Sequence, residues 1–207
     1  MDEKTVTCFV VDDDASVRQS LSFLLRSLRY RVETFDSADG FLSRDRYDGI
    51  GCIITDVKMP GMSGLDLQDT VGRSDNPLPI IFITGHGDLP MGVRAMKKGA
   101  VDFLAKPFDD GDLISAIAAA LDKCRKARQA SKDVTNAQNR FDKLSPREHD
   151  VLRHVISGRL NKQIAGELDI AEQTVKIHRG RIMKKLGVDS VAELVRLAEK
   201  AGIAHAP

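Results

Sequence analysis

Short apolar runs alternate with amphipathic stretches over the first part of the chain. The runs cover residues 8–11, 53–55, 80–83 and 101–105, and a weaker one lies at 32–35. Apolar runs of this length, bounded by turn-forming or charged residues, are typical of strands that are buried on both faces. Between them, apolar side chains recur every three or four positions, which predicts helices. Strands that alternate with helices in this way predict βαβ units and a parallel sheet.

The pattern changes in the last third of the chain, where helical spacing continues without strand-like runs. Ser145 is expected to cap a helix, with Pro146 at the first helical position and Glu148 completing a capping box. We therefore predict that an all-α unit begins here.

Three further helices are predicted in this all-α unit. Asn161 is expected to cap a short helix, and a longer one runs over 172–186 and ends before Gly187. Ser190 with Glu193 predicts a second capping box, which opens the last helix. Two of these helices joined by a tight turn form a candidate helix-turn-helix.

The segment between the two patterns contains neither Gly nor Pro from residue 112 to residue 145. Its apolar residues recur at spacings of three and four over 127–141, which is a narrow helical stripe. We predict a helical linker over 125–141, between a first domain at 1–124 and a second domain at 142–207. A disordered linker is the alternative, because the Asn, Thr and Asp residues in its second half are poor helix formers.

The composition is that of an ordinary globular protein, with 42% hydrophobic and 29% charged residues. The N-terminus lacks a basic-then-apolar signal sequence, and no apolar run reaches the roughly 20 residues that span a bilayer. The cysteines Cys8, Cys52 and Cys124 do not have the spacing of a metal site and are interpreted as small core residues. We therefore expect a cytoplasmic protein without a membrane partner.

Polar side chains follow four of the predicted strands at their carboxyl ends. They are Asp12 and Asp13, Asp56, Thr84 and Lys106. Alone, Asp56 would be interpreted as a turn residue, but in a doubly wound sheet all these ends converge. Crowded carboxylates repel one another unless a cation neutralises them, and a set of oxygen ligands suits Mg²⁺. With a hydroxyl and a lysine beside them, they predict a site where a carboxylate attacks a phosphoryl group.

Residues 1–124 resemble the receiver domain of two-component response regulators. The resemblance is carried by Val10-Val11-Asp12-Asp13, Asp56, Met59-Pro60, Gly64, Thr84 and Lys106-Pro107. It implies an α/β fold with a doubly wound, five-stranded parallel sheet in the flavodoxin-like order 2-1-3-4-5. It also implies that a sensor histidine kinase transfers a phosphoryl group to Asp56.

The same resemblance implies a metal site. Asp13, Asp56 and the backbone carbonyl of Lys58 would bind Mg²⁺ or Mn²⁺, and Asp12 would act on the metal through a water molecule.

Further roles follow from the resemblance for residues near the phosphoryl group. Thr84 and Lys106 would bind the phosphoryl oxygens, and the Lys106-Pro107 peptide bond would be cis. Phe103 would be a switch residue whose ring moves as Thr84 moves. An ordinary core position is the alternative for Phe103.

The predicted helix over 172–186 carries charge of one sign along most of its length. From Thr174 to Val188 there is no acidic residue, and the basic residues are Lys176, Arg179, Arg181, Lys184 and Lys185. A solvent-exposed helix normally mixes both signs, so this stripe indicates a phosphate-rich partner. An ordinary basic surface is the alternative.

Residues 142–207 resemble the four-helix, LuxR-type helix-turn-helix domain of the FixJ/NarL regulators. The matching segments are 144–148, 161–165, 174–178 and 183–186. The resemblance implies that base edges in the major groove are read by Lys176 and Ile177. It implies that phosphates are contacted mainly by Asn161, Lys162, Thr174, Arg179 and Lys184.

Two positions depart from that family. Gly180 stands where relatives often place a base-reading Lys or Asn, and a helical Gly costs about 1 kcal/mol relative to Ala. Ala171 stands where a capping Ser is common, so the helix is expected to begin loosely. The base preference of relatives therefore does not transfer to this chain.

Together these features predict a phosphorylation-activated transcriptional regulator that binds double-stranded DNA. Its other partners would be a sensor histidine kinase, a second copy of the chain upon phosphorylation, and RNA polymerase as a further candidate. Dimers are expected through the face with Phe103 and the helix over 91–98, and on DNA through the last helix near Leu194.

Two alternatives remain at this stage, although no enzymatic activity is expected. One is an aspartyl-phosphate phosphohydrolase or phosphotransferase of the haloacid-dehalogenase type. Those enzymes place a second Asp two residues after the nucleophile, where this chain has Lys58. The other is a regulator whose receiver only dimerises, and the full set of acids with Thr84 and Lys106 argues against it.

Overall fold

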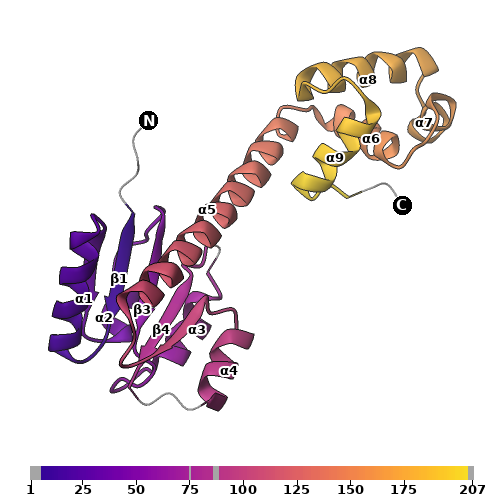
Figure 1. Ribbon diagram of the computed structural model, residues 1–207. Coiled ribbons are helices and arrows are strands. Elements are labelled where there is room, and N and C mark those ends of the chain that lie inside the picture. The colour runs from indigo at the N-terminus through magenta and orange to yellow at the C-terminus, as the bar shows by residue number, and fades with distance from the viewer. Residues whose placement is uncertain (1–5, 75, 86–88, 205–207) are drawn as a thin grey trace. The chain divides into compact units, whose positions relative to one another are not determined.

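The computed structural model describes residues 6–74, 76–85 and 89–204 (Figure 1). The chain divides into two compact units, which meet between Arg128 and Gln129. This division falls inside the segment 125–141, for which the sequence predicts a linker. Among the described residues, no helix combines the length and the apolar character that a membrane span requires.

The first unit is built on a five-stranded parallel sheet with the order β2-β1-β3-β4-β5, which confirms the predicted fold class. The strands are β1 (Thr7–Val11), β2 (Arg31–Phe35), β3 (Gly51–Thr55), β4 (Ile80–Thr84) and β5 (Asp102–Ala105). Because β2 lies on one side of β1 and β3 on the other, the topological switch point lies between β1 and β3.

Helices cover both faces of this sheet (Figure 1). They are α1 (Ala15–Ser27), α2 (Ala38–Leu42), α3 (Gly64–Val71), α4 (Leu89–Lys97) and α5 (Asp110–Phe141). Successive strand residues point to opposite faces. Cys8 of β1 therefore belongs to the core formed with α1 and α5, which includes Leu25. Phe9 belongs to the core formed with α2, α3 and α4, which includes Phe41.

The described residues of the second unit form helices that pack around one hydrophobic core. They are α6 (Pro146–Ile156), α7 (Asn161–Leu168), α8 (Glu172–Leu186) and α9 (Val191–Ala201). The end of α5 is part of this core, because Ala137 and Phe141 are 2% and 1% exposed. An ion pair of 2.8 Å between Asp133 and Lys200 also joins α5 to α9. The all-α fold of this unit agrees with the sequence.

The predicted capping box of α6 is present, whereas that of α9 forms only in part. Ser145 Oγ accepts from the N–H of Glu148, and the Glu148 carboxylate accepts from the N–H of Ser145. Ser190 likewise accepts from the N–H of Glu193. The Glu193 carboxylate, however, accepts from the N–H of Asp189 at 3.0 Å and not from Ser190.

The predicted cap of α7 is wrong by one residue. Asn161 is the first helical residue, and Leu160 is the N-cap, without a side-chain capping bond. The N–H of Leu160 instead donates to Gln163 Oε1 at 2.8 Å. Because Gln163 satisfies that donor, the helix begins without a polar N-cap side chain, and Asn161 is left to interact with α8.

Candidate functional site

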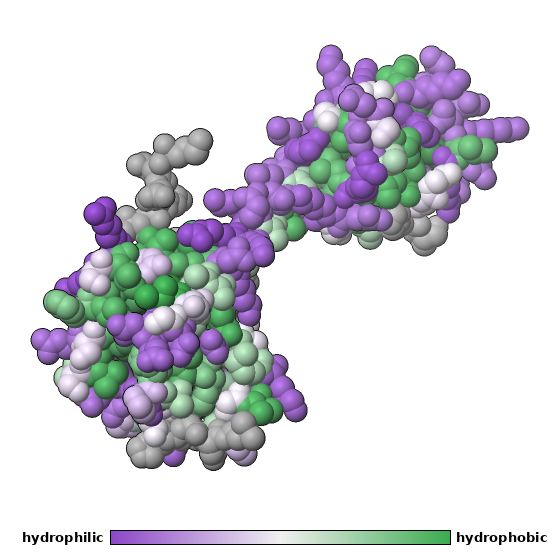
Figure 2. Space-filling view, viewed as in Figure 1, coloured by the Kyte–Doolittle hydropathy of each residue, from purple (hydrophilic) through white to green (hydrophobic). Residues whose placement is uncertain are grey.

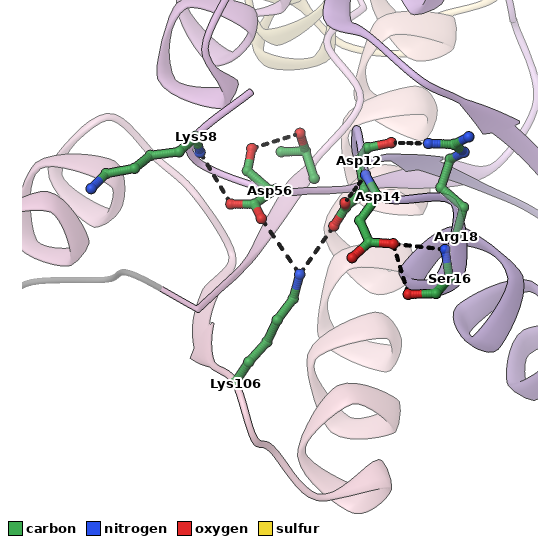
Figure 3. A network of polar contacts seen from close by, with 8 residues as sticks. Asp12, Asp14, Ser16, Arg18, Asp56, Lys58 and Lys106 are labelled. Atoms are coloured by element: carbon green, nitrogen blue, oxygen red, sulfur yellow. Dashed lines mark hydrogen bonds and ion pairs between the residues drawn. The ribbon is translucent and has the colours of Figure 1, made fainter. Parts of the chain in front are cut away.

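Two carboxylates and one ammonium group meet at the carboxyl edge of the sheet (Figure 3). Asp12 directly follows β1 and Asp56 directly follows β3, and these strands are neighbours. Lys106 directly follows β5. Its Nζ lies 3.1 Å from Asp12 Oδ2 and 3.4 Å from Asp56 Oδ2. The lysine therefore bridges the two acids.

Backbone hydrogen bonds hold the second oxygen of each carboxylate. Asp12 Oδ1 accepts from the N–H of Asp14 at 2.9 Å, and Asp56 Oδ1 accepts from the N–H of Lys58 at 3.0 Å. Arg18 Nη1 donates to the carbonyl oxygen of Asp12 at 2.6 Å. In each acid, one carboxylate oxygen is thus hydrogen-bonded to a backbone N–H and the other points toward Lys106 (Figure 3).

The two acids differ in their exposure to water. The Asp12 side chain is 3% exposed and the Asp56 side chain is 15% exposed. Burial raises the pKa of the Asp12 carboxyl, the hydrogen bonds from Asp14 and Lys106 oppose this rise, and the charge of Asp56 adds to it. Asp56 is therefore the more accessible of the two acids.

Asp13, which is also predicted to bind the metal, is not gathered with these two acids. Asp13 is exposed. The Lys58 side chain extends away from Asp56 (Figure 3), and the expected ligand from Lys58 is its backbone carbonyl, which stays a prediction. In the described ranges, no three Asp, Glu, His or Cys side chains lie close enough to hold a metal ion. The donor set is nevertheless the all-oxygen chemistry that Mg²⁺ takes, and Asp13 directly follows Asp12. The residues therefore fit a cation, provided that Asp13 joins them.

Thr84 brings a hydroxyl to the same edge. It ends β4 and is 1% exposed. The N–H of Lys106 donates to the carbonyl oxygen of Thr84 at 2.8 Å, so the two residues are held side by side. The Lys106-Pro107 peptide bond is cis.

Phe103 lies on β5, between the buried core and α4. Its ring is half-buried, with its centroid 6.2 Å from that of Phe82. A Cβ added at Gly92 of α4 would come within 3.3 Å of the Phe103 ring. Gly92 therefore allows α4 to lie close to this ring.

The structure explains why residue 64 is a glycine, which the sequence motif alone did not. A Cβ at this position would come within 2.1 Å of the carbonyl oxygen of Asp56. The N–H of Gly64 also donates to the carbonyl oxygen of Val57 at 3.0 Å. Glycine thus permits the loop after Asp56 to fold back against the strand end.

One residue of the site was missed by the sequence interpretation. Arg18 fixes the backbone of Asp12 by donating to its carbonyl oxygen. The available signal was an arginine one turn into the helix that follows three consecutive acids.

The outer face of α8 carries the predicted base-reading residues. Lys176 is exposed, and Ile177 is 46% exposed although it is apolar. Figure 2 shows mainly hydrophilic residues along this helix. The residues that are buried on its inner face are Val175, Ile182 and Leu186. The helix therefore presents one surface to the core and a basic surface to solvent.

The predicted phosphate-contacting residues lie on α7 and α8. Lys162 and Lys184 are exposed, and Thr174 lies half-buried in the first turns of α8. Arg179 Nη1 donates to Asn161 Oδ1 at 2.9 Å, which ties α8 to the start of α7. Asn161 therefore positions the guanidinium of Arg179.

Lys185 has a different role from the other basic residues of α8. Its Nζ lies 2.6 Å from Glu148 Oε2, and the Glu148 side chain is only 4% exposed. Burial raises the pKa of the Glu148 carboxyl, but hydrogen bonds from Lys185 and Ser145 outweigh it and lower the pKa to about 2. Lys185 thus stabilises the packing of α6 against α8.

The two departures from the LuxR pattern have visible consequences. Ala171 is the N-cap of α8 and makes no side-chain capping bond, as the sequence leads us to expect. Gly180 is exposed, and a Cβ there would meet no atom within 4 Å. No packing requirement in the described structure explains glycine at this position.

Family comparisons agree with this arrangement of two units. The family described as "Response regulator receiver domain" matches residues 8–118. The family described as "Bacterial regulatory proteins, luxR family" matches residues 142–198. These matches correspond to the α/β unit and the helical unit.

Individual relatives match almost the whole chain. Nodulation protein W of Bradyrhizobium diazoefficiens is 51% identical over 195 residues, which cover 94% of this chain and 86% of that protein. Transcriptional regulatory protein FixJ of the same organism is 44% identical over 198 residues, 94% of this chain and 95% of the relative.

Solved structures give the same result. Response regulator StyR has a TM-score of 0.81 at 52% identity, covering 95% of this chain and 99% of that chain. Full-length FixJ from B. japonicum has a TM-score of 0.55 at 41% identity, covering 96% of this chain and 98% of that chain.

Proposed function

The chain belongs to the response regulators that join a receiver domain to a LuxR-type DNA-binding domain, and we propose that phosphorylation of Asp56 controls its binding to promoter DNA. Membership is consistent with transcription regulation. The observation that carries the proposal is the convergence of Asp12, Asp56 and Lys106, where one Nζ lies within 3.4 Å of both carboxylates. This arrangement supplies a nucleophile together with a fixed cation.

Asp56 is the phosphoryl acceptor in this proposal. Its Oδ2 attacks the phosphorus of a phosphohistidine on the kinase, the P–O bond forms as the P–N bond breaks, and the imidazole leaves with the electron pair. Oδ1 is held by the N–H of Lys58, which orients the carboxylate for this attack. Asp12 is less suited, because its side chain is 3% exposed against 15% for Asp56.

The residues around Asp56 would neutralise the charge of the phosphoryl group. Asp12, Asp13, Asp56 and the backbone carbonyl of Lys58 would hold Mg²⁺ or Mn²⁺, which stabilises negative charge on phosphoryl oxygens when bound. Lys106 already lies beside Asp56 and would bind one phosphoryl oxygen.

Thr84 and Phe103 would carry the signal to the surface of the receiver. The Thr84 hydroxyl would move toward the phosphoryl group and change the space available to the Phe103 ring. That ring contacts the position of Gly92, so its movement would reach α4. Val93 and Met96 of α4 are each 45% exposed, and we infer that this apolar surface forms the contact between two phosphorylated copies.

In the dimer, each α8 would enter a major groove of a two-fold symmetric site. Lys176 and Ile177 would read base edges, and Asn161 would hold Arg179 toward a phosphate. Lys162, Thr174 and Lys184 would add phosphate contacts.

The contact expected on DNA through α9, near Leu194, would use the exposed residues of that helix. Leu194 is 1% exposed and belongs to the core of the second unit, so it cannot form a surface contact. Val191 is the large apolar residue of that helix that is exposed, at 39%. We infer that Val191 takes part in a contact between copies through α9.

The acceptor residue is tested by phosphorylation with acetyl phosphate and Mg²⁺, followed by intact-protein mass spectrometry. The full chain should gain one phosphoryl group, and Asp56→Asn should gain none. Asp45→Asn, which changes an exposed acid in the segment after α2, serves as the control and should behave like the unaltered chain. Phosphorylation of Asp56→Asn at the unaltered rate would overturn the assignment.

A further inference from the structure

A cavity of about 420 Å³ opens in the first unit, away from the carboxyl edge that holds Asp56. It lies between the segment that follows α2 and the segment that follows α3. These segments lead into β3 and β4, so the cavity is at the amino ends of these strands. A ligand bound there would not compete with a phosphoryl group on Asp56.

The floor of this cavity is apolar. Phe41 and Leu42 come from α2, Val71 comes from the end of α3, and Leu78 precedes β4. Cavities of this size and lining bind small molecules, whose apolar part fills the floor while a few polar groups fix the orientation.

The rim of the cavity is cationic. Arg44, Arg46 and Arg73 line it, together with the single carboxylate of Asp48. That carboxylate is already shared by Arg46 at 3.3 Å and Arg128 at 3.5 Å. The lining therefore has positive charge in excess of its own acids.

The Arg44 side chain is held in place by two aromatic rings and one backbone carbonyl oxygen. Its guanidinium carbon lies 4.3 Å from the ring centroid of Phe41 and 4.6 Å from that of Phe9. Nη1 donates to the carbonyl oxygen of Asp45 at 2.7 Å. Nε is buried, and within the described ranges it has no hydrogen-bond partner. Two aromatic faces thus fix a cation for which the described residues supply no direct ion pair.

Electrostatics agree with this geometry. Burial lowers the pKa of the Arg44 guanidinium, and the charge of Glu33 acts in the opposite direction. Glu33 does not line the cavity, and its carboxylate lies 3.0 Å from Arg31. A half-buried cation without its own counter-ion favours binding of an anion.

We infer that this cavity binds a small organic carboxylate with an aromatic or branched apolar body. The carboxylate would face Arg44, Arg46 and Arg73, and the apolar body would lie against the half-buried Leu42 and Val71. Inorganic phosphate could interact only with the arginines of the rim, and a neutral hydrocarbon could interact only with the apolar floor. This inference does not rest on the phosphorylation of Asp56.

The test is a titration of the unphosphorylated full-length chain with 2-naphthoate, followed by ¹H–¹⁵N NMR. Millimolar 2-naphthoate should shift the amide signals of residues 41–48 and 70–74. The neutral analogue 2-naphthamide should bind about tenfold more weakly or not at all, because it lacks the charge that the arginines recognise. Inorganic phosphate should not reproduce the shifts of the floor residues.

Variants locate the site without disturbing the core. Arg46→Gln and Arg73→Gln change exposed side chains, and together they should weaken 2-naphthoate binding about tenfold or more. Arg153→Gln, an exposed arginine of the second unit, is the matched control and should leave binding unchanged. The inference is overturned if 2-naphthoate and 2-naphthamide bind equally well, or if Arg153→Gln weakens binding as much as the Arg46 and Arg73 changes do. It is also overturned if 2-naphthoate shifts no amide signal around the cavity.

Discussion

Acidification should destabilise the second unit through Glu148, whose carboxylate is bonded to Lys185 and to the N–H of Ser145. Its pKa is lowered from the ordinary 4.5 to about 2 in the folded state. A carboxyl whose folded pKa is depressed stabilises the fold above its unfolded pKa, and this stability is lost as the pH falls through the folded pKa. The window is therefore from about pH 5 to about pH 2.

The size of the effect follows from the shift. At 1.36 kcal/mol per pKa unit, the shift corresponds to about 3 kcal/mol, of which about 2 kcal/mol is lost by pH 3. Glu148→Gln resembles the protonated acid, so it should cost about 3 kcal/mol at pH 7 and much less at pH 3. Glu193 is solvent-exposed and lies in the same unit, so Glu193→Gln is the control. Its cost in unfolding free energy should be similar at pH 7 and at pH 3.

Urea unfolding of the second unit must be followed without aromatic fluorescence. The chain has no Trp, and its Tyr residues, Tyr30 and Tyr47, both lie in the first unit. Amide signals of α6 and α8 in ¹H–¹⁵N NMR report on the second unit alone. If the unaltered chain and Glu148→Gln lose the same free energy of unfolding between pH 7 and pH 3, the assigned role of this carboxylate is wrong.

Three further predictions concern packing and DNA contact. Gly64→Ala should destabilise the first unit by about 2 kcal/mol or more, because its Cβ would overlap the carbonyl oxygen of Asp56; a thermal melt that matches the unaltered chain would contradict this. Phe141→Ala should cost the second unit about 3–5 kcal/mol in urea unfolding, and a cost below 1 kcal/mol would show that the end of α5 is not part of that core. Lys184→Ala should weaken DNA binding and reduce the slope of log Kd against log salt concentration by about one, because it removes a phosphate contact. Lys185→Ala should mainly lower the stability of the second unit, because it removes the partner of Glu148. The assignment is refuted if Lys185→Ala changes the salt slope and Lys184→Ala lowers the stability in urea.

The sheet could be predicted from the sequence because burial leaves a direct pattern. Strands covered by helices on both faces need apolar side chains on both faces, so β1, β3 and β4 appear as short apolar runs. The polar residue after each run then marks the carboxyl edge, which is why Asp12, Asp56 and Lys106 could be placed together before their distances were known.

Details that depend on competition between partners could not be predicted. Gln163 satisfies the donor of Leu160, so the polar Asn161 becomes the first residue of α7 instead of its cap. Lys185 belongs to the basic stripe in sequence, but the buried Glu148 binds it. A local pattern does not show which partner from another helix reaches a given side chain.

The cavity with Arg44 was also beyond sequence interpretation. Its arginines stand in two segments, 44–46 and 73, which the order of the strands brings together. Neither segment has a motif of its own. Arg44 differs from an ordinary surface arginine because its guanidinium lies over the rings of Phe9 and Phe41. These two residues are far apart in the sequence, so the contact has no local pattern.

In the proposed function, a phosphoryl group on Asp56 increases the affinity of the full chain for its DNA site. The direct measurement is fluorescence anisotropy with a duplex selected from genomic fragments bound by the phosphorylated chain, before and after treatment with acetyl phosphate and Mg²⁺. Treatment should lower the Kd of the unaltered chain by at least about tenfold, which is about 1.4 kcal/mol, and should leave the Kd of Asp56→Asn unchanged. An equal gain in affinity for Asp56→Asn, or no gain for a chain shown to be phosphorylated, would contradict it.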